Sequence, residues 1–140
     1  MRKILLIAVL AIAAVACNKN QKVVKTLDGS WNATSYLDTW DGETTEYIVP
    51  GTSVKMAFDN CKLKDNEFCR VTFTFTEGTD TDVEILDYRV GGYGTSLLLR
   101  DPEYPIDLTY MEIVELTKDR LELKADYGDG ETIQFKLEKE

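Results

Sequence analysis

Residues 71–76 have the sequence Val-Thr-Phe-Thr-Phe-Thr, a strict alternation of apolar and polar side chains. Successive side chains of a β-strand point to opposite faces of a sheet. Val71, Phe73 and Phe75 therefore share one face, and the three threonines share the other. This alternation is typical of a strand with one face on a hydrophobic core and the other in water.

The same pattern continues through the chain on both sides of this segment. Leu121 and Leu123 alternate with charged residues, and Ile133, Phe135 and Leu137 alternate with polar ones. Beyond residue 27 the sequence contains no long amphipathic helical pattern. The alternation predicts eight strands, at residues 30–38, 53–61, 68–76, 82–90, 95–100, 107–116, 120–127 and 131–138.

Turn-forming residues separate the predicted strands. Asp-Gly pairs at 41–42 and 129–130 are strong signals of β-hairpins. Glu-Gly at 77–78 and Gly-Gly at 91–92 are weaker signals, and Thr-Lys-Asp-Arg at 117–120 predicts a tight polar turn. Eight short strands with short connections imply sequential antiparallel pairing, and closing the sheet removes its exposed edges. We therefore predict an all-β fold for residues 27–140, an eight-stranded antiparallel up-and-down barrel.

One predicted strand contains a change of phase. Val83 and Ile85 fall on the opposite face from Leu86, Tyr88 and Val90 if the strand is regular. An extra residue in a strand would restore a continuous apolar face. The sequence therefore predicts a β-bulge near Ile85 and Leu86.

The N-terminus has the pattern of an export signal. A short basic start precedes an apolar run at residues 4–16, which ends in Ala14-Val15-Ala16. The run is too short for a hydrocarbon core of roughly 30 Å, so a retained transmembrane helix is the weaker interpretation. Cys17 follows directly, and Ala-Val-Ala-Cys resembles the lipobox of bacterial lipoproteins, in which the cysteine carries fatty acids such as palmitate. An ordinary secretory signal followed by a cysteine is the alternative.

This resemblance implies a cleaved lipoprotein signal peptide at residues 1–16 and a lipidated tether at residues 17–26. Residues 18–25 are polar and basic, and we expect them to form either a soluble linker or a contact with anionic headgroups. The lipid on Cys17 would anchor the protein to a membrane of the bacterial cell envelope. No acidic run follows Cys17, which favours the periplasmic side of the outer membrane over the cell surface.

Two further cysteines, Cys61 and Cys69, enclose the segment Lys-Leu-Lys-Asp-Asn-Glu-Phe, whose polar centre is typical of a hairpin turn. Exported proteins reside in an oxidising compartment, where such pairs form disulfides. We predict a structural disulfide worth roughly 2–3 kcal/mol. A catalytic dithiol would need the closer C-x-x-C spacing and an activating environment.

The composition argues against many activities. The chain has 140 residues, a net charge of −9 and no histidine. Histidine-based triads, Cys-His pairs and His-ligated zinc sites are therefore impossible. The negative charge argues against nucleic acid as a partner. Carboxylates gather at residues 80–84 and 126–131, but without the spacing of a calcium loop, and we expect solvated turns there. We expect no enzyme activity, catalytic residue, metal or cofactor.

Leu27-Asp28-Gly29-Ser30-Trp31 opens the first predicted strand with a Gly-x-Trp element that resembles the start of a lipocalin barrel. Together with segments at 88–99, 113–123 and 135–137 and the lipobox, it resembles the bacterial lipocalin-like domain of small lipoproteins. The resemblance covers residues 27–139. It implies an eight-stranded up-and-down barrel, in a family whose specific ligands are mostly unknown.

Aromatic residues divide into two groups. Those in predicted strands are expected to fill the core. Trp40, Tyr47, Tyr93 and Tyr104 fall in predicted loops, where they offer a binding surface for a sugar, an apolar ligand or a protein. Loops that fold over the barrel as lids are the alternative.

Two functions remain in competition. Large apolar residues at inward positions favour a filled barrel, and hence a non-catalytic protein-interaction or structural module whose charge attracts a basic protein partner. The alternative is a carrier or sensor of a small apolar ligand or sugar in the barrel mouth. The residues expected to fill the interior are Val71, Phe73, Phe75, Leu97, Leu99, Leu121, Leu123, Phe135 and Leu137.

Overall fold

The computed structural model describes residues 19–62 and 67–140, which form nine strands and a helix at residues 19–27. The strands are β1 (Gly29–Trp40), β2 (Glu43–Glu46), β3 (Thr52–Phe58), β4 (Cys69–Glu77), β5 (Asp80–Gly91), β6 (Ser96–Arg100), β7 (Leu108–Leu116), β8 (Arg120–Gly128) and β9 (Glu131–Lys139).

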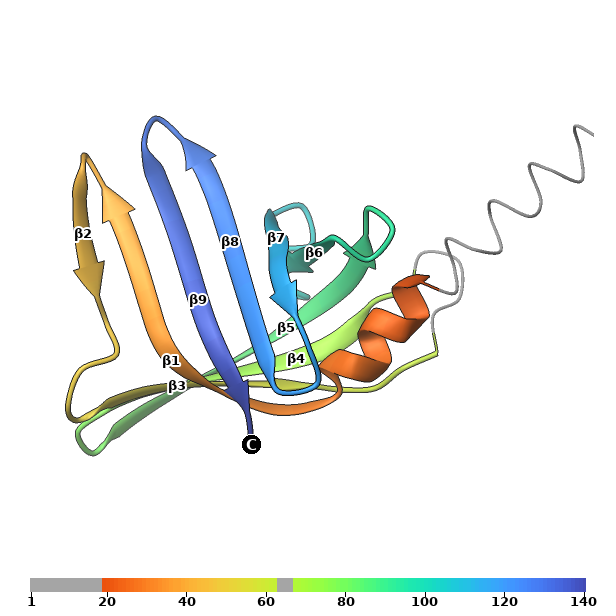
Figure 1. Ribbon diagram of the computed structural model, residues 1–140, viewed down its shortest axis with the longest axis horizontal. Helices are drawn as coiled ribbons and strands as arrows, with labels where there is room; N and C mark the ends of the chain where they lie inside the picture. The colour runs from red at the N-terminus through yellow and green to blue at the C-terminus, as the bar shows by residue number, and fades with distance from the viewer. Residues whose placement is uncertain (1–18, 63–66) are drawn as a thin grey trace, which may run out of the picture.

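The strands form one antiparallel sheet that closes into a barrel (Figure 1). Each strand from β3 to β9 pairs with the next, and β1 pairs with both β3 and β9, which closes the ring of eight. The ninth strand, β2, pairs with the outer half of β1, from Leu37 to Trp40, where β3 has diverged. The predicted all-β barrel is confirmed, and the short strand β2 was not predicted.

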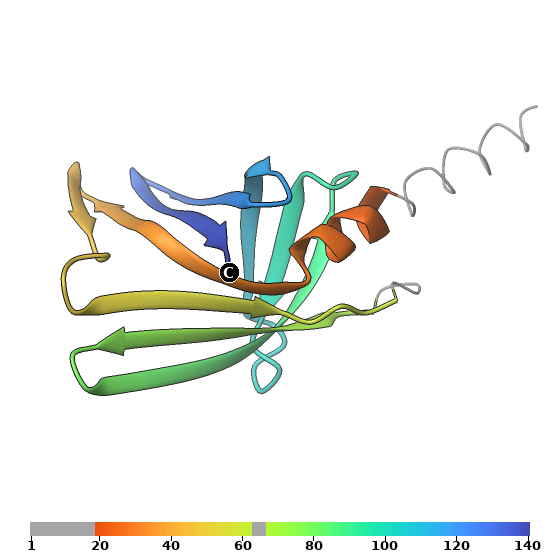
Figure 2. The ribbon, with the colours of Figure 1, turned by 60° about the horizontal axis from the view of Figure 1, so that its bottom comes forward.

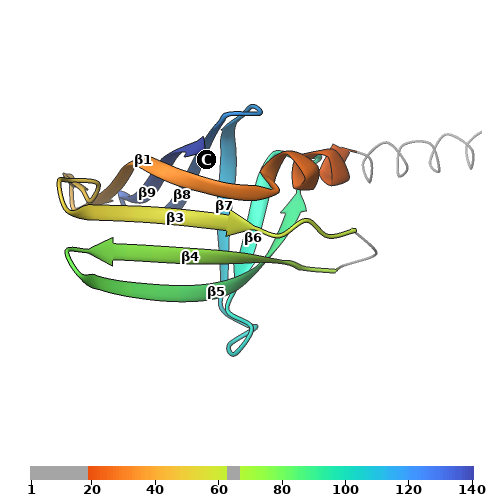
Figure 3. The ribbon, with the colours of Figure 1, turned by 90° about the horizontal axis from the view of Figure 1, so that it is seen from below.

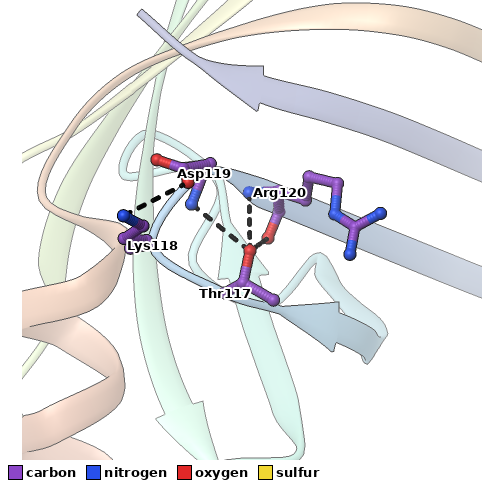
Figure 4. A network of polar contacts seen from close by, with 4 residues as sticks. All are labelled: Thr117, Lys118, Asp119 and Arg120. Carbon is purple, nitrogen blue, oxygen red and sulfur yellow. Dashed lines mark hydrogen bonds and ion pairs between the residues drawn. The ribbon is translucent and has the colours of Figure 1, made fainter.

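The hairpin turns follow the residues that predicted them. Asp41 and Gly42 both have positive φ, as do Asp129 and Gly130, which is the conformation that matches the twist of a two-residue hairpin. Figure 4 shows the polar turn between β7 and β8. There the Thr117 hydroxyl accepts hydrogen bonds from the backbone amides of Asp119 and Arg120, at 3.3 and 2.9 Å.

The predicted bulge near Ile85 and Leu86 is wrong. The register between β4 and β5 runs without a shift from Cys69 opposite Tyr88 to Glu77 opposite Asp80. Val83 and Ile85 instead point outward and are 60% and 47% exposed. A bulge does occur in β1, between Ala33 and Ser35, where its pairing with β9 shifts.

The helix at residues 19–27 covers one end of the barrel, which we call the closed end (Figures 2 and 3). Val24 and Leu27, three residues apart on one helical face, are fully buried in the core. The helix is tied down by Lys139 Nζ, which donates to Thr26 O at 3.0 Å, and by Gln21 Nε2, which donates to Cys61 O at 3.1 Å. The prediction of a polar tether is therefore wrong for residues 19–26, because the apolar pair is spaced for a helix.

The core fills the closed half of the barrel. Trp31 is fully buried under the helix, and its Nε1 donates to Leu27 O at 2.7 Å. Lys139, from the last strand, lies over the Trp31 ring, with Nζ at 5.0 Å from its centroid. Around this pair the strands contribute further fully buried side chains: Met56, Val71, Tyr88, Leu97, Leu121, Leu123 and Leu137. This half of the interior is packed as the sequence predicts.

The predicted disulfide is present between Cys61 and Cys69, with Cα atoms 5.8 Å apart. Cys69 begins β4, and Cys61 follows the end of β3 rather than belonging to it. The bond therefore links the segment after β3 to the start of β4, beside the helix, whose Gln21 donates a hydrogen bond to Cys61 O.

Candidate functional site

The end of the barrel opposite the helix, which we call the mouth, is hollow. The hairpins β1–β2, β4–β5 and β8–β9 and the loops 47–51 and 101–107 surround it. Two adjoining hollows, of about 340 and 500 Å³, share Phe73, Glu84 and Phe135 as common walls. Small-molecule sites in proteins have volumes of this order. The first is also lined by Leu86, Leu99, Asp101, Asp107, Thr109, Met111, Tyr127 and Ile133, and the second by Tyr36, Tyr47, Val54, Thr74, Phe75, Asp82 and Val83.

One wall of the site is a stack of three aromatic rings. The Tyr36 ring lies 4.8 Å from that of Tyr47 and 4.4 Å from that of Phe135, with interplanar angles of 29° and 22°. Offset stacking of this kind holds rings in fixed positions. The stack joins β1, β9 and the segment after β2 into a rigid, mostly apolar wall.

The bulge in β1 explains why Tyr36 faces the hollow. Residues directly opposite each other in an antiparallel pair point to the same side of the sheet. Before the bulge Ala33 pairs with Leu137, and after it Tyr36 pairs with Phe135 and Asp38 with Ile133. Without the extra residue, Tyr36 and Asp38 would face outward. A single inserted residue thus supplies the site with a phenol and a carboxylate.

Strand β5 brings two carboxylates to the opposite wall. Asp82 pairs with Phe75 and Glu84 with Phe73, so their side chains lie on the inner face of the barrel. The expected turn is wrong for these two residues, which belong to β5, but both are exposed to solvent as expected, and both line the hollows. Asp101 and Asp107, from the loop between β6 and β7, add carboxylates at the rim of the first hollow.

Asp38 lies on the inner face beside the tyrosines. Burial raises the pKa of the Tyr36 phenol, and the negative charge of Asp38 raises it further. The pKa of Tyr127 is also raised, by burial and by Glu131 and Asp38, against the opposing effect of a hydrogen bond with Thr109. Asp38 Oδ1 is buried and accepts no hydrogen bond from the described residues. The hollows are therefore lined by protonated phenols, and a carboxylate oxygen without a hydrogen-bond partner lies beside them.

Arg100 also borders the first hollow, but its guanidinium is held by other groups. Its Nε donates to Asp87 Oδ2 at 3.2 Å, and its Cζ lies 3.7 Å from the centroid of the Phe68 ring. Asp87 pairs with Arg100 across β5 and β6, on the face opposite to Tyr88 and Leu99. The charge of Arg100 is therefore compensated on the outer surface of the barrel.

The filled interior predicted from the sequence is wrong for the mouth half. Phe73 and Phe75 are half-buried and line the hollows, and Leu99 and Phe135 are buried but border them. The mouth half is not filled because several residues that point inward there are carboxylates, such as Asp82. Charged side chains cannot pack against one another in a dry core, so this half stays open to water.

The four loop aromatics do not form one surface. Tyr47 lines the second hollow, while Trp40 ends β1 and Tyr104 belongs to the loop 101–107, both at the mouth. Tyr93 lies between β5 and β6 at the closed end, next to Gly94, which approaches Val23 of the helix. The structure therefore brings three of the four residues to the mouth and separates Tyr93 from them.

Comparison with known proteins gave no match, either to a protein-family model or to a curated protein. Cys17 and residues 1–16 lie outside the described residues. In the part of the chain that the structure describes, no helix has the length and apolar character needed to cross a membrane. Within the same part, no three carboxylates or cysteines are grouped closely enough to ligate one metal ion.

Three residues in or beside the site were not predicted from the sequence: Tyr36, Asp38 and Tyr127. A signal for them exists in the order of inward residues along each strand. On β5 this order is Asp82, Glu84, Leu86, Tyr88 and Val90, from the mouth to the closed end. A strand whose buried face begins with carboxylates and ends with apolar residues indicates a barrel that is open at one end.

Proposed function

We propose that the protein binds a small molecule in the mouth of its barrel and acts as a carrier or sensor in the bacterial cell envelope. The observation that supports this is the pair of adjoining hollows, lined by stacked aromatic rings and a few polar groups. Ligand sites commonly combine an apolar lining with a small number of polar groups in this way.

The energetics of the fold agree with this proposal. The closed half contains the fully buried side chains, the helix and the disulfide, so the barrel does not need a filled mouth to be stable. Phe73, Phe75 and Phe135 expose apolar surface to the hollows instead. Covering such surface releases about 25 cal/mol per Å², and a ligand that enters the mouth gains this free energy.

Leu86 and its neighbour Ile85 provide a test of ligand binding. Leu86 lines the first hollow, whereas Ile85 points outward from the same strand. Leu86→Trp should fill part of the hollow and weaken binding of the neutral fluorophore N-phenylnaphthylamine at least about tenfold, which corresponds to 1.4 kcal/mol. Fluorescence titration measures the dissociation constant.

Ile85→Trp is the matched control, because it adds the same side chain on the outer surface. It should leave the dissociation constant of the fluorophore unchanged. Both variants need thermal unfolding curves to show that the barrel is folded. Equal affinities for the two variants, or no binding by the parent protein, would contradict a ligand site in the mouth.

The membrane anchor is a second part of the proposal, supported by Ala14-Val15-Ala16 directly before Cys17. Cys17 stands two residues before Lys19, which already belongs to the helix at the closed end. Two residues span at most about 7 Å, so a lipid on Cys17 holds the closed end near the membrane. The mouth then opens away from the lipid surface, towards diffusing ligands.

Replacing Cys17 with serine should remove the lipid and release the protein from membranes into the soluble fraction. Fractionation of cells that produce the parent or the variant measures this directly. Lipobox processing is refuted if the serine variant still sediments with membranes, because an uncut apolar segment would then be the anchor.

A protein-interaction role at the rim is the second candidate. The segment from Tyr104 to Leu108 exposes three large apolar side chains, among them Ile106, which is 88% exposed. This segment includes Asp107, which lines the first hollow, so a protein bound to the segment would lie beside the ligand.

A further inference from the structure

We infer that the ligand of the mouth is a small organic cation: a protonated amine or quaternary ammonium group on an aromatic or apolar body. This inference rests on the proposed function, because it concerns the same hollows. It names the charge of the ligand, which an apolar pocket alone would not specify.

Negative charge predominates around the mouth. The hollows are lined by Asp82 and Glu84 on β5 and by Asp101 and Asp107 at the ends of the loop between β6 and β7. Asp38 stands on the inner face of β1, beside this lining but outside it. The one basic residue among those that line the described hollows is Arg100, whose guanidinium is bound by Asp87 and Phe68.

A mouth with this charge has a strong preference for cations. Carboxylates on low-dielectric walls focus a negative potential into the space between them. A positively charged ligand is attracted by this potential, and an anion is repelled. The net charge of −9 acts in the same direction over longer distances.

Asp38 adds a further negative charge beside the hollows. It raises the pKa of Tyr36 and of Tyr127, both of which line them. Its Oδ1 is buried and has no hydrogen-bond partner among the described residues. A cation in the hollows is attracted by this charge.

The lining of the hollows is rich in aromatic rings. The faces of aromatic rings carry partial negative charge and attract cations within about 6 Å of the ring centroid. Tyr36, Tyr47 and Phe135 form a stacked wall on the side of Asp38, and Phe73 and Phe75 stand beside the two carboxylates of β5. Aromatic rings and carboxylates thus line the same hollows. Such a lining binds a cation and its apolar body together.

Three probes that share a naphthyl ring but differ in charge distinguish the effect of charge from that of hydrophobicity. At pH 7 naphthylethylamine is a cation, naphthylethanol is neutral and naphthylacetate is an anion. Isothermal titration should show the protonated amine binding at least about tenfold tighter than the neutral alcohol, because the carboxylates that line the hollows attract its charge. The anion should bind weakest. Asp38→Asn and Glu84→Gln should each reduce the preference for the amine over the alcohol.

Glu112→Gln is the matched control, because it removes one carboxylate from an exposed position on β7 and changes the net charge equally. It should keep the full preference. Naphthylethanol should bind all four proteins alike, which also shows that each variant retains a folded mouth. Competition of the amine by calcium ions at equal concentration would indicate a metal site and overturn the inference.

The outcomes distinguish this inference from the proposed function. Equal affinity for all three probes, abolished by Leu86→Trp, would overturn the cation preference and leave the ligand site in place. An unchanged preference in both Asp38→Asn and Glu84→Gln would also overturn it. Absence of binding by all three probes would overturn the ligand site together with the inference.

Discussion

Tyr88 shows at the scale of one residue how the closed half is stabilised. Its side chain is fully buried, its ring meets that of Phe58 edge-on at 5.2 Å, and its hydroxyl donates to Asp59 O at 2.9 Å. Burial raises the pKa of this phenol, and the charges of Asp28 and Asp59 raise it further. The phenol therefore stays protonated in the folded state at a pH where the unfolded chain ionises.

This shift predicts alkaline destabilisation. A tyrosine in the unfolded chain ionises at its ordinary pKa of 10.0. As the pH rises above this value, the unfolded state binds fewer protons than the folded state, so the free energy of unfolding falls by up to about 1.4 kcal/mol per pH unit for each such group. Tyr36 and Tyr127, whose pKa values are also raised, contribute in the same direction.

Tyr88→Phe should reduce this pH dependence. At neutral pH the variant loses a buried hydrogen bond, at a cost of about 1 kcal/mol. Above pH 10 its unfolding free energy should fall less steeply than that of the parent, so the difference in stability between the two narrows. Urea unfolding at a series of pH values measures both slopes, and parallel slopes would contradict the account of Tyr88.

At the scale of elements, the strands were predictable because their signal is local. A strand with one buried face alternates apolar and polar residues, and β4 and β9 do so almost without exception. The Asp-Gly turns were predictable for the same reason, since their backbone conformation depends on two residues. The site was harder to predict from the sequence, because the bulge in β1 that turns Tyr36 and Asp38 inward has no local signature there.

The helix shows why a short element is missed. Only Val24 and Leu27 are fully buried, in a segment that is otherwise mostly polar. A helix of this length has little stability of its own, and its contacts with the barrel provide the rest. Those contacts come from distant residues, such as Lys139 and Cys61. The sequence alone does not show these contacts, because they form only when the barrel has closed.

At the scale of the whole molecule, the barrel has two different halves. The closed half contains the packed core, the helix and the disulfide, and the mouth contains the aromatic rings and the carboxylates. One end of the strands thus stabilises the fold, and we propose that the other end binds a ligand. Because the closed half is packed, inward residues at the mouth can be carboxylates, which pack poorly, and the protein stays folded.

The most direct test of this account locates a ligand on the barrel. Amide chemical shifts of the isotope-labelled protein should be measured while N-phenylnaphthylamine is added. We expect the largest changes at residues that line the hollows, including Leu86, Leu99 and Phe135, and little change around Trp31 at the closed end. Changes confined to the outer surface near Ile85, or no saturable changes at all, would contradict a ligand site inside the mouth.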